Sequence, residues 1–474
     1  MAAGRDGWGR HTGDEGQFMS IDEAIRTFDR KHEEYERDLL EFLRFATISR
    51  DSERAGDMRA CAEWVRNQLA GAGLQAEVVE TGGHPAVFAD TGPVAGSKTP
   101  TLLVYGHYDV QPVGDETLWK SPPFEPTVRD GAIFARGSAD DKGQVMVHIA
   151  AMRALHDAGL PFPVRLKFLI EGEEEIGSRH LAPYLRQNWD KLACDHVLIS
   201  DTSKHSADTP SLTQATRGII GKVVTVHGPD HDLHSGVFGG TVANPANILA
   251  RIIASFHDEQ NRVTIPGFYD DVRMPTDEER RALAETDLSD EELIKATGSP
   301  GPHGEAGFTT AERRGTRPTL DVNGLQCGSS ATIVPSQATA YITMRLVPDQ
   351  DPAKIIAAFD QAVRAACPPT VRVSISSSQG SRAYVAPLDL PVMKVARRAM
   401  EEVYGRPPVI VREGGTLPIL PLFKEVLGAD SVMMGFADPN CNLHSPNEFF
   451  HLRDFQLGVR CVLRFLGLLG QPAS

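Results

Sequence analysis

Residues 101–110, TLLVYGHYDV, decide the fold, because a short apolar run ends there in the metal-binding type of side chain His107. The arrangement recurs in RLKFLI before the acidic residues 171–175, in HVLIS before Asp201, and in VMMGF before a loop carrying His444. Short apolar runs of this kind predict buried strands, and the carboxyl ends of such strands meet at one edge of an open α/β sheet. Carboxylates and imidazoles gathered there would hold a divalent cation. The repeated pattern therefore indicates a metallohydrolase.

The length of 474 residues predicts two domains, since single cores usually stop growing near about 250–300 residues. The predicted fold class is α/β, with an open twisted sheet, largely parallel and covered by helices on both faces, formed by residues 21–213 and 385–474. Residues 214–384 predict an inserted α+β domain. Residues 1–20, rich in glycine and charge and without the apolar core of a secretory signal, predict a flexible leader.

The inserted domain has its own pattern of elements. Strands are predicted at 217–228, 338–348 and 371–378, and helices at 244–259 and 351–366. The polar stretch 261–319 predicts a surface insertion with short helices, and its charge run is most simply a solvated face.

Charge and cysteine content exclude several classes of partner. The net charge of −15, from 48 basic and 63 acidic residues, would repel phosphate backbones and anionic lipid surfaces, so neither nucleic acid nor a membrane is an expected partner. No run approaches the roughly 18 apolar residues of a membrane span. The six cysteines are scattered without CxxC pairs, which indicates reduced thiols and a cytoplasmic protein. Cys441 stands out because it lies three residues before His444.

Eight short motifs follow one another over most of the chain: HYDVQP, ARGSADDKG, EGEEEIGS, ISD, DLHSGVFGG, MRLVP, EGGTLPI and NLHSPNE. In this order they resemble the M20 metallopeptidases, and within that family the branch of the cytosolic nonspecific dipeptidase and carnosinase. The resemblance implies a dipeptidase that binds two divalent metal ions, Zn²⁺ or Mn²⁺. It also implies that the inserted domain serves as a lid and as the contact of a homodimer.

Two metal ions about 3.5–4 Å apart require a bridging carboxylate. Asp140 is the natural bridge, because the small residues of its loop, GSADDKG, let the backbone approach closely. Each candidate ligand taken alone has a simpler explanation as a helix cap or a surface hydrogen-bonding group, and the joint pattern argues against it. The resemblance implies His107, Asp140 and Asp201 on one ion and Asp140, Glu175 and His444 on the other, with a cis peptide bond between Asp140 and Asp141 and no ligand role for Asp141.

The catalytic residues follow less directly from the residues themselves. Asp109 lies two positions from His107, so on an extended segment both side chains project to the same side, as suits a carboxylate that orients an imidazole. A turn cap is the alternative. Composition does not choose among the acids of 171–175. The resemblance implies that Asp109 also supports the base, that Glu174 is the general base beside the ligand Glu175, and that Glu173 is not catalytic.

Substrate-binding candidates come from the inserted domain and from the segment after it. The resemblance implies that His234 stabilises the oxyanion in the partner's active site, with a packed edge histidine as the alternative. It also implies that Arg345 binds the C-terminal carboxylate of the substrate, with a surface ion pair as the alternative. Gly415 and Thr416, in the turn GGT, could offer N–H and hydroxyl groups to the same carboxylate, unless this is a simple tight turn before Pro418.

The predicted function is hydrolysis of dipeptides by a dinuclear metal site, in which a metal-bridged hydroxide attacks the carbonyl and Glu174 transfers the proton. The same site would serve an N-acyl-amino-acid deacylase or a carboxypeptidase-like amidohydrolase, because all three share the attack. They differ in whether the pocket binds a free α-amine. A non-catalytic binding protein is the hypothesis from another class, and the complete ligand set with Glu174 argues against it.

Overall fold

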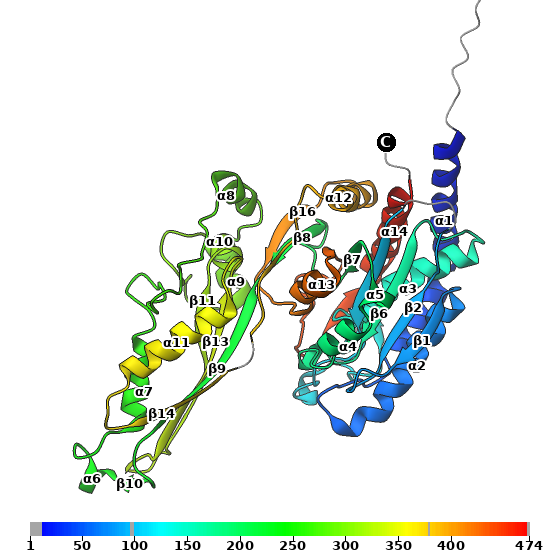
Figure 1. Cartoon of the computed structure of the whole chain (residues 1–474). Coiled ribbons are helices and arrows are strands. Elements are labelled where there is room, and N and C mark those ends of the chain that lie inside the picture. The colour runs from blue at the N-terminus through cyan, green and yellow to red at the C-terminus, as the bar shows by residue number, and fades with distance from the viewer. Residues whose placement is uncertain (1–11, 95–98, 378–379, 472–474) are drawn as a thin grey trace, which may run out of the picture. The chain divides into compact units, whose positions relative to one another are not determined.

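The computed structural model describes residues 12–94, 99–377 and 380–471, which form two compact units (Figure 1). The first unit comprises Met1–Thr213, Ala386–Val409 and Leu422–Ser474, and the second comprises Gln214–Val385 and Ile410–Pro421. The segment Ile410–Pro421, which we predicted to belong to the sheet domain, thus packs with the second unit.

A nine-stranded mixed sheet is the main element of the fold. Its order is β1-β2-β6-β3-β7-β17-β8-β15, with β16 paired to β8. The central pairs β6–β3, β3–β7 and β7–β17 are parallel, whereas β1–β2, β2–β6, β17–β8 and β8–β15 are antiparallel. The expectation of a largely parallel sheet is therefore wrong outside the four central strands; β1 and β2, for example, are consecutive strands joined by a short connection, which favours an antiparallel pair. The bounds are β1 Gln75–Val79, β2 Ala86–Asp90, β3 Thr101–His107, β6 Arg165–Glu171, β7 His196–Ile199, β8 Ser211–Thr216, β15 Tyr384–Val385, β16 Val409–Glu413 and β17 Asp430–Gly435.

Helices cover both faces of this sheet, as predicted (Figure 1). The ring of Tyr105 on β3 contacts Phe423 of α13, with centroids 5.2 Å apart. The next residue, Gly106, faces Val145 of α3. Because successive strand residues point to opposite faces, α13 and α3 lie on opposite sides. Among the described residues, no helix is long and apolar enough to cross a membrane. The helices are α1 Thr12–Phe42, α2 Ala55–Gly71, α3 Lys142–Asp157, α4 Leu181–Gln187, α5 Trp189–Leu192, α12 Pro391–Tyr404, α13 Ile419–Leu427 and α14 Leu452–Leu469.

Helix α1 begins at Thr12, within residues 1–20 for which a flexible leader is predicted. Residues 1–11 lie outside the described residues, but residues 12–20 are helical. The later part of α1 is anchored by the buried side chains of Ile21, Ala24 and Phe28, which share one face. Lengthening an anchored helix needs no new nucleus, so glycine-containing turns can continue it.

The second unit is built on an antiparallel sheet of order β11-β13-β9-β14. Strand β9 alternates buried and partly exposed residues along its whole length, and its buried face packs with two helices around one core. The three strands and two helices predicted here are confirmed, whereas β11 was not predicted. The bounds are β9 Gly218–His227, β11 Thr319–Cys327, β13 Gln337–Leu346, β14 Arg372–Ser377, α7 Pro245–Ala254 and α11 Pro352–Ala366, with a small pair β10 Leu233–His234 and β12 Ile333–Val334 beside α6 Ser235–Phe238.

The polar stretch 261–319 contains three short helices, as predicted. They are α8 Asp277–Ala284, α9 Asp290–Thr297 and α10 Thr310–Gly315. Each begins with a capping box in which a Ser or Thr and a Glu three residues later satisfy each other's backbone N–H groups.

Candidate metal centre

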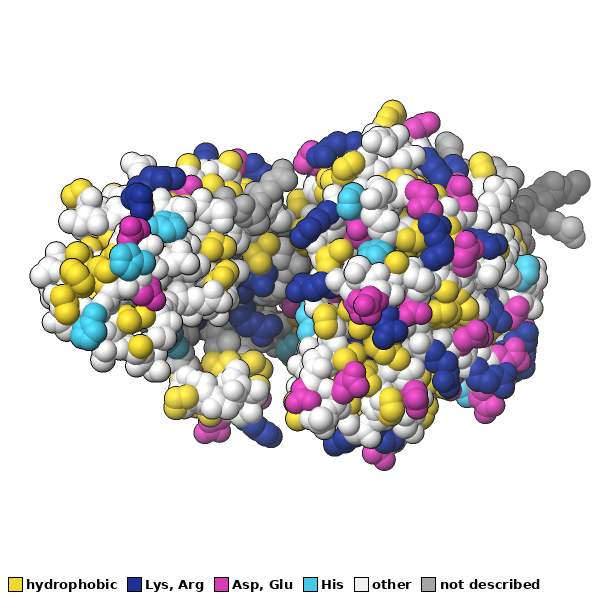
Figure 2. Space-filling view, turned by 90° about the horizontal axis from the view of Figure 1, so that it is seen from below, with side chains coloured by type: hydrophobic (Ala, Val, Ile, Leu, Met, Phe, Trp, Pro, Cys, Tyr) yellow, Lys and Arg dark blue, Asp and Glu magenta, His cyan; other side chains and the backbone are white. Residues whose placement is uncertain are grey.

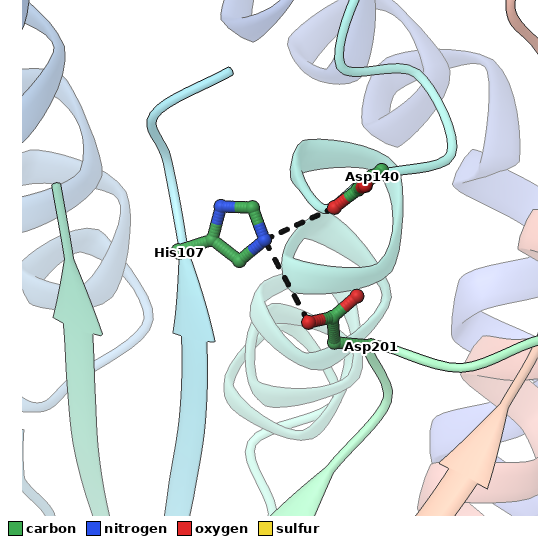
Figure 3. A group of neighbouring side chains, drawn as sticks. All are labelled: His107, Asp140 and Asp201. Carbon is green, nitrogen blue, oxygen red and sulfur yellow. Dashed lines mark hydrogen bonds and ion pairs between the residues drawn. The ribbon is translucent and has the colours of Figure 1, made fainter. Parts of the chain in front are cut away.

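The predicted ligands meet at one edge of the main sheet, within the first unit. The four central strands run parallel, so their carboxyl ends share this edge. His107 is the last residue of β3, Asp201 follows β7, and Glu175 lies in the turn after β6. Asp140 comes from the loop before α3 and points with Asp201 toward the His107 ring (Figure 3).

A first group consists of His107, Asp140 and Asp201, whose ligand atoms all lie within 4.8 Å of one another. The His107 Nε2 atom is 3.1 Å from Asp140 Oδ1 and 3.7 Å from Asp201 Oδ2. The other ring nitrogen, Nδ1, is 3.0 Å from the Asp109 carbonyl oxygen and 3.4 Å from its carboxylate. Although burial disfavours the charged ring, hydrogen bonds with Asp109 and Asp140 hold the pKa of His107 well above its usual value. The negative charges around the imidazole therefore favour a cation at this position.

A second group consists of Asp140, Glu175 and His444. The His444 Nε2 atom lies 2.8 Å from Asp140 Oδ2 and 3.4 Å from Glu175 Oε2. Asp140 thus uses one carboxylate oxygen in each group, which is the geometry of a bridging ligand. Gln111 fixes Glu175 through a 2.7 Å hydrogen bond from Nε2 to Oε2. Burial, followed by the nearby Asp140 charge, raises the pKa of Asp201 to about 7.

The donor set fits a pair of divalent ions. Each group offers one imidazole nitrogen and carboxylates from two residues, a combination that suits Zn²⁺ or Mn²⁺. The peptide bond between Asp140 and Asp141 is cis, as expected. Asp141 belongs to neither group; its Oδ2 atom accepts the backbone N–H of His107 at 3.2 Å.

Asp109 connects His107 with the acidic turn 171–175. Its buried carboxylate accepts the backbone N–H groups of Glu174 at 3.2 Å and of Glu175 at 3.1 Å while facing His107. Burial, with further contributions from the neighbouring carboxylates, raises the pKa of Glu174 well above its usual value. No described residue hydrogen-bonds the Glu174 carboxylate, whereas the Glu173 carboxylate is hydrogen-bonded to His180. The structure thus separates Glu174 from Glu173, which composition alone could not do.

Glu448 is the residue of this site that the sequence reasoning missed. Its fully buried carboxylate accepts the backbone N–H groups of Gly137, Ala139 and Asp140 at 2.9–3.1 Å and pairs with Arg136 at 2.8 Å. Strand β18 Phe449–His451 pairs with β5 Ala132–Phe134, itself paired with β4 Thr127–Arg129, and this brings Glu448 to the loop. Its signal was its position four residues after His444 in the motif NLHSPNE.

The predicted substrate-binding residues lie in the second unit. His234 is exposed, and its Nδ1 atom accepts the backbone N–H of Gly236 at the start of α6. Arg345 donates from Nη1 to the Thr416 hydroxyl oxygen at 2.6 Å. The turn at Gly415 accepts a backbone hydrogen bond from Arg217. The structure therefore brings Arg345 and the 414–416 turn together.

Residues 103–467 match the profile of Peptidase family M20/M25/M40. The chain belongs to this family. The predicted membership in the M20 peptidases is therefore confirmed, and the ligand groups described above lie inside the matched region.

Several M20 relatives match nearly the whole chain. The Cys-Gly metallodipeptidase dug1 of Schizosaccharomyces pombe is 30% identical over 473 residues, which cover 94% of this chain and 98% of that protein. The structure of human carnosine dipeptidase 1 has a TM-score of 0.83 and 25% identity, covering 95% of this chain and 99% of that one. An M20 family metallo-carboxypeptidase of Sulfolobus solfataricus, Sso-CP2, has a TM-score of 0.83 and 33% identity, covering 92% and 99%.

Proposed function

We propose that this M20 peptidase is a metal-dependent dipeptidase that hydrolyses the single peptide bond of a free dipeptide. The observation that carries the proposal is the pair of ligand groups that share Asp140, with the Glu174 carboxylate free of hydrogen-bond partners in the described part of the chain. The similarity to dipeptidases over almost the full length supports the substrate class.

The roles of the residues follow from their positions. Two bound ions, Zn²⁺ or Mn²⁺, would polarise the scissile carbonyl and lower the pKa of a water molecule. Glu174, whose carboxylate forms no hydrogen bond with a described residue, accepts the proton of the attacking water and donates it to the leaving amine. Asp109 holds the His107 ring and the acidic turn in fixed relative positions through its contacts with both.

Arg345, Gly415 and Thr416 are proposed to bind the substrate's C-terminal carboxylate, and His234 to stabilise the oxyanion in the partner subunit of a homodimer. The 2.6 Å hydrogen bond between Arg345 and Thr416 supports the first assignment. The second unit exposes the hydrophobic side chains of Val237 and Phe238 near His234 in the chain. Figure 2 shows hydrophobic side chains gathered on the end of this unit that carries α6 and β10, as a contact with a second copy would require.

A carboxypeptidase-like activity is the second candidate, because the Sulfolobus relative at 33% identity is named a metallo-carboxypeptidase. An N-acyl-amino-acid deacylase would use the same ligands. The pocket separates these activities, since a dipeptidase must also bind a free α-amine.

The deciding experiment is hydrolysis of a substrate panel by metal-free protein reconstituted with Zn²⁺ or Mn²⁺. The panel holds free dipeptides, the same dipeptides with acetylated N-termini, N-acetyl amino acids and longer peptides. Metal-dependent cleavage confined to free dipeptides is the expected result. Faster cleavage of acetylated substrates would replace the dipeptidase by a deacylase, and removal of C-terminal residues from longer peptides would replace it by a carboxypeptidase.

We also propose a cytoplasmic location. All six cysteines are free, and Cys61, Cys441 and Cys461 are buried. Reduced thiols are typical of that compartment.

A further inference from the structure

Three arginines surround the turn 414–416 in the second unit, and we call them the arginine cluster. Arg217 lies between β8 and β9, Arg314 lies in α10, and Arg345 lies near the end of β13. Two of them are half-buried, and Arg314 is exposed. Burial, followed by the charges of Arg345 and Arg314, lowers the pKa of Arg217 to about 10. The three positive charges are thus close enough to act on one another.

Two members of the arginine cluster donate hydrogen bonds to uncharged oxygen atoms of the turn 414–416. Arg217 donates from Nε to the Gly414 carbonyl oxygen at 2.9 Å, and Arg345 donates to Thr416. The point where a Cβ atom of Gly414 would stand is 3.2 Å from Arg217 Nη2 and 3.8 Å from Arg314 Nε. Two guanidinium groups therefore flank the same face of a residue that has no side chain. Further N–H donors of both groups remain available there.

No carboxylate in the described part of the chain forms an ion pair with the arginine cluster. In the same unit, the buried Arg317 and the half-buried Arg412 are each neutralised by a glutamate at 2.7 Å. The acids that act on the cluster are Asp321, which accepts a hydrogen bond from Thr319, and Glu413, whose pKa is raised by burial. Half-buried positive charges without partners are costly, and an anion that fills the space between them relieves that cost.

One carboxylate does not use the whole cluster. A carboxylate bound by Arg345 and the Thr416 hydroxyl pairs with a single guanidinium group. Arg217 and Arg314 then face a second position beside Gly414. A second carboxylate a few bonds away would be matched by these two. Aspartate and glutamate as C-terminal residues carry two carboxylates at such a spacing.

We infer that the arginine cluster selects dipeptides whose C-terminal residue is acidic, with Arg345 on the main-chain carboxylate and Arg217 with Arg314 on the side-chain carboxylate. This inference rests on the proposed dipeptidase function and names its substrate class. It makes Arg314 a residue that determines specificity, since it is the member of the cluster without a described hydrogen bond to the turn.

The test compares Ala-Glu with Ala-Gln, which have the same shape and differ in one charge. The full-length protein, loaded with Zn²⁺ or Mn²⁺, should have a kcat/KM about tenfold or more higher for Ala-Glu, as a charge-assisted hydrogen bond predicts. Arg314→Gln should bring the ratio of the two kcat/KM values close to one. Arg313→Gln is the matched control, because Arg313 bonds the carbonyl oxygens of Glu305 and His303 and should leave the ratio unchanged.

The outcomes separate this inference from the proposed function. If no free dipeptide of the panel is cleaved while other substrates are, the dipeptidase assignment fails. If other free dipeptides are cleaved but Ala-Glu is not, the dipeptidase assignment stands and the acidic selectivity is refuted. If both are cleaved with equal kcat/KM, or if Arg314→Gln keeps the wild-type ratio, dipeptide hydrolysis stands and the acidic selectivity is refuted. Inorganic phosphate is the competing anion: inhibition by phosphate that depends on Arg314, together with equal rates for the two dipeptides, would assign the cluster to phosphate instead.

Discussion

The Glu448 carboxylate accepts the backbone N–H of Asp140 at 3.1 Å, although 308 positions separate the two residues in the chain. The same carboxylate accepts the N–H groups of Gly137 and Ala139 and pairs with the buried Arg136. A residue that contacts no ligand atom therefore holds the backbone of the residue shared by both candidate ion sites.

Glu448→Ala should destabilise the protein and lower its metal content. The substitution leaves the Arg136 charge and three N–H groups without their partner in a buried place, which costs about 3 kcal/mol or more in the free energy of unfolding. Urea denaturation and metal analysis measure the two effects. Glu401→Gln, at an exposed position of α12, is the control and should change neither. Wild-type stability in Glu448→Ala would disprove the anchoring role.

Glu174→Gln should abolish turnover and leave metal content intact. The amide cannot accept the water proton, so kcat should fall by at least about 10²–10⁴-fold. Metal analysis of the same preparation shows whether the ligand groups survive. Glu173→Gln is the neighbouring control and should keep its activity, because Glu173 bonds His180 and the backbone of His84 and belongs to neither ligand group. An active Glu174→Gln enzyme would mean that another residue is the base.

His444→Ala should reduce the metal content from two ions to about one per chain. It removes the only imidazole of the second group, while the first group keeps His107, Asp140 and Asp201. Metal analysis after dialysis against buffer without chelator gives the stoichiometry. A content equal to that of the wild type would remove His444 from the ligands.

Chelation should lower the thermal stability, and added Zn²⁺ or Mn²⁺ should restore it. Bound cations neutralise the crowded carboxylates of Asp140, Glu175 and Asp201, and a ligand at 100 times its Kd adds about 2.7 kcal/mol to the free energy of unfolding. Scanning calorimetry with and without EDTA measures the shift. In Asp140→Asn, which weakens the shared ligand, the response to added ions should be smaller. Equal melting temperatures in EDTA and in Zn²⁺ would contradict a metal-binding site.

The buried His148 should make the protein sensitive to acid. Burial lowers its pKa to about 3, whereas the unfolded chain has an ordinary histidine value near 6.5. As the pH falls below about 6.5, the unfolded state takes up a proton that the folded state does not, so this group lowers the free energy of unfolding by up to about 1.4 kcal/mol per pH unit.

His148→Gln tests this contribution, since glutamine can keep the hydrogen bond to the Ser200 hydroxyl, now 2.8 Å long. In metal-free protein, the stability difference between wild type and variant should be constant above pH 7 and should shift in favour of the variant toward pH 5. The difference in the free energy of unfolding at pH 7.5 measures the effect of the substitution on packing alone, because His148 is neutral in both states at that pH. A difference that does not vary with pH would show that His148 is not protonated on unfolding in this range.

The candidate metal ligands at strand ends could be located from the sequence because a buried strand leaves a clear apolar run. His107 and Asp201 follow such runs, and parallel pairing brings them together. Asp140 and His444 lie in loops, where no periodicity exists, and their assignment depended on the family motifs. Glu448 was missed because an acid in a polar loop gives no sign of burial; its environment is created by β18 pairing with β5, a contact between distant segments.

The fold was predictable to a similar extent. Strand β9 has the strict alternation of a half-buried strand, whereas β11 is mostly exposed and contains a register shift between Val322 and Gly324, so its period is obscured. The parallel core follows from apolar runs, but the antiparallel edge strands depend on connection geometry. The apolar pattern of the sequence therefore predicts which strands are buried, but it does not predict whether neighbouring strands are parallel or antiparallel.

The contacts of Glu448 and His444 also set an order on biosynthesis. The loop 137–140 leaves the ribosome long before its partner carboxylate is made, and until residues 444–448 emerge its N–H groups lack their acceptor and Arg136 lacks its ion-pair partner. The second ligand group needs His444, so the nascent chain cannot assemble both groups during most of its translation. A complete pair of ions would thereby be reserved for chains whose synthesis has passed residue 448.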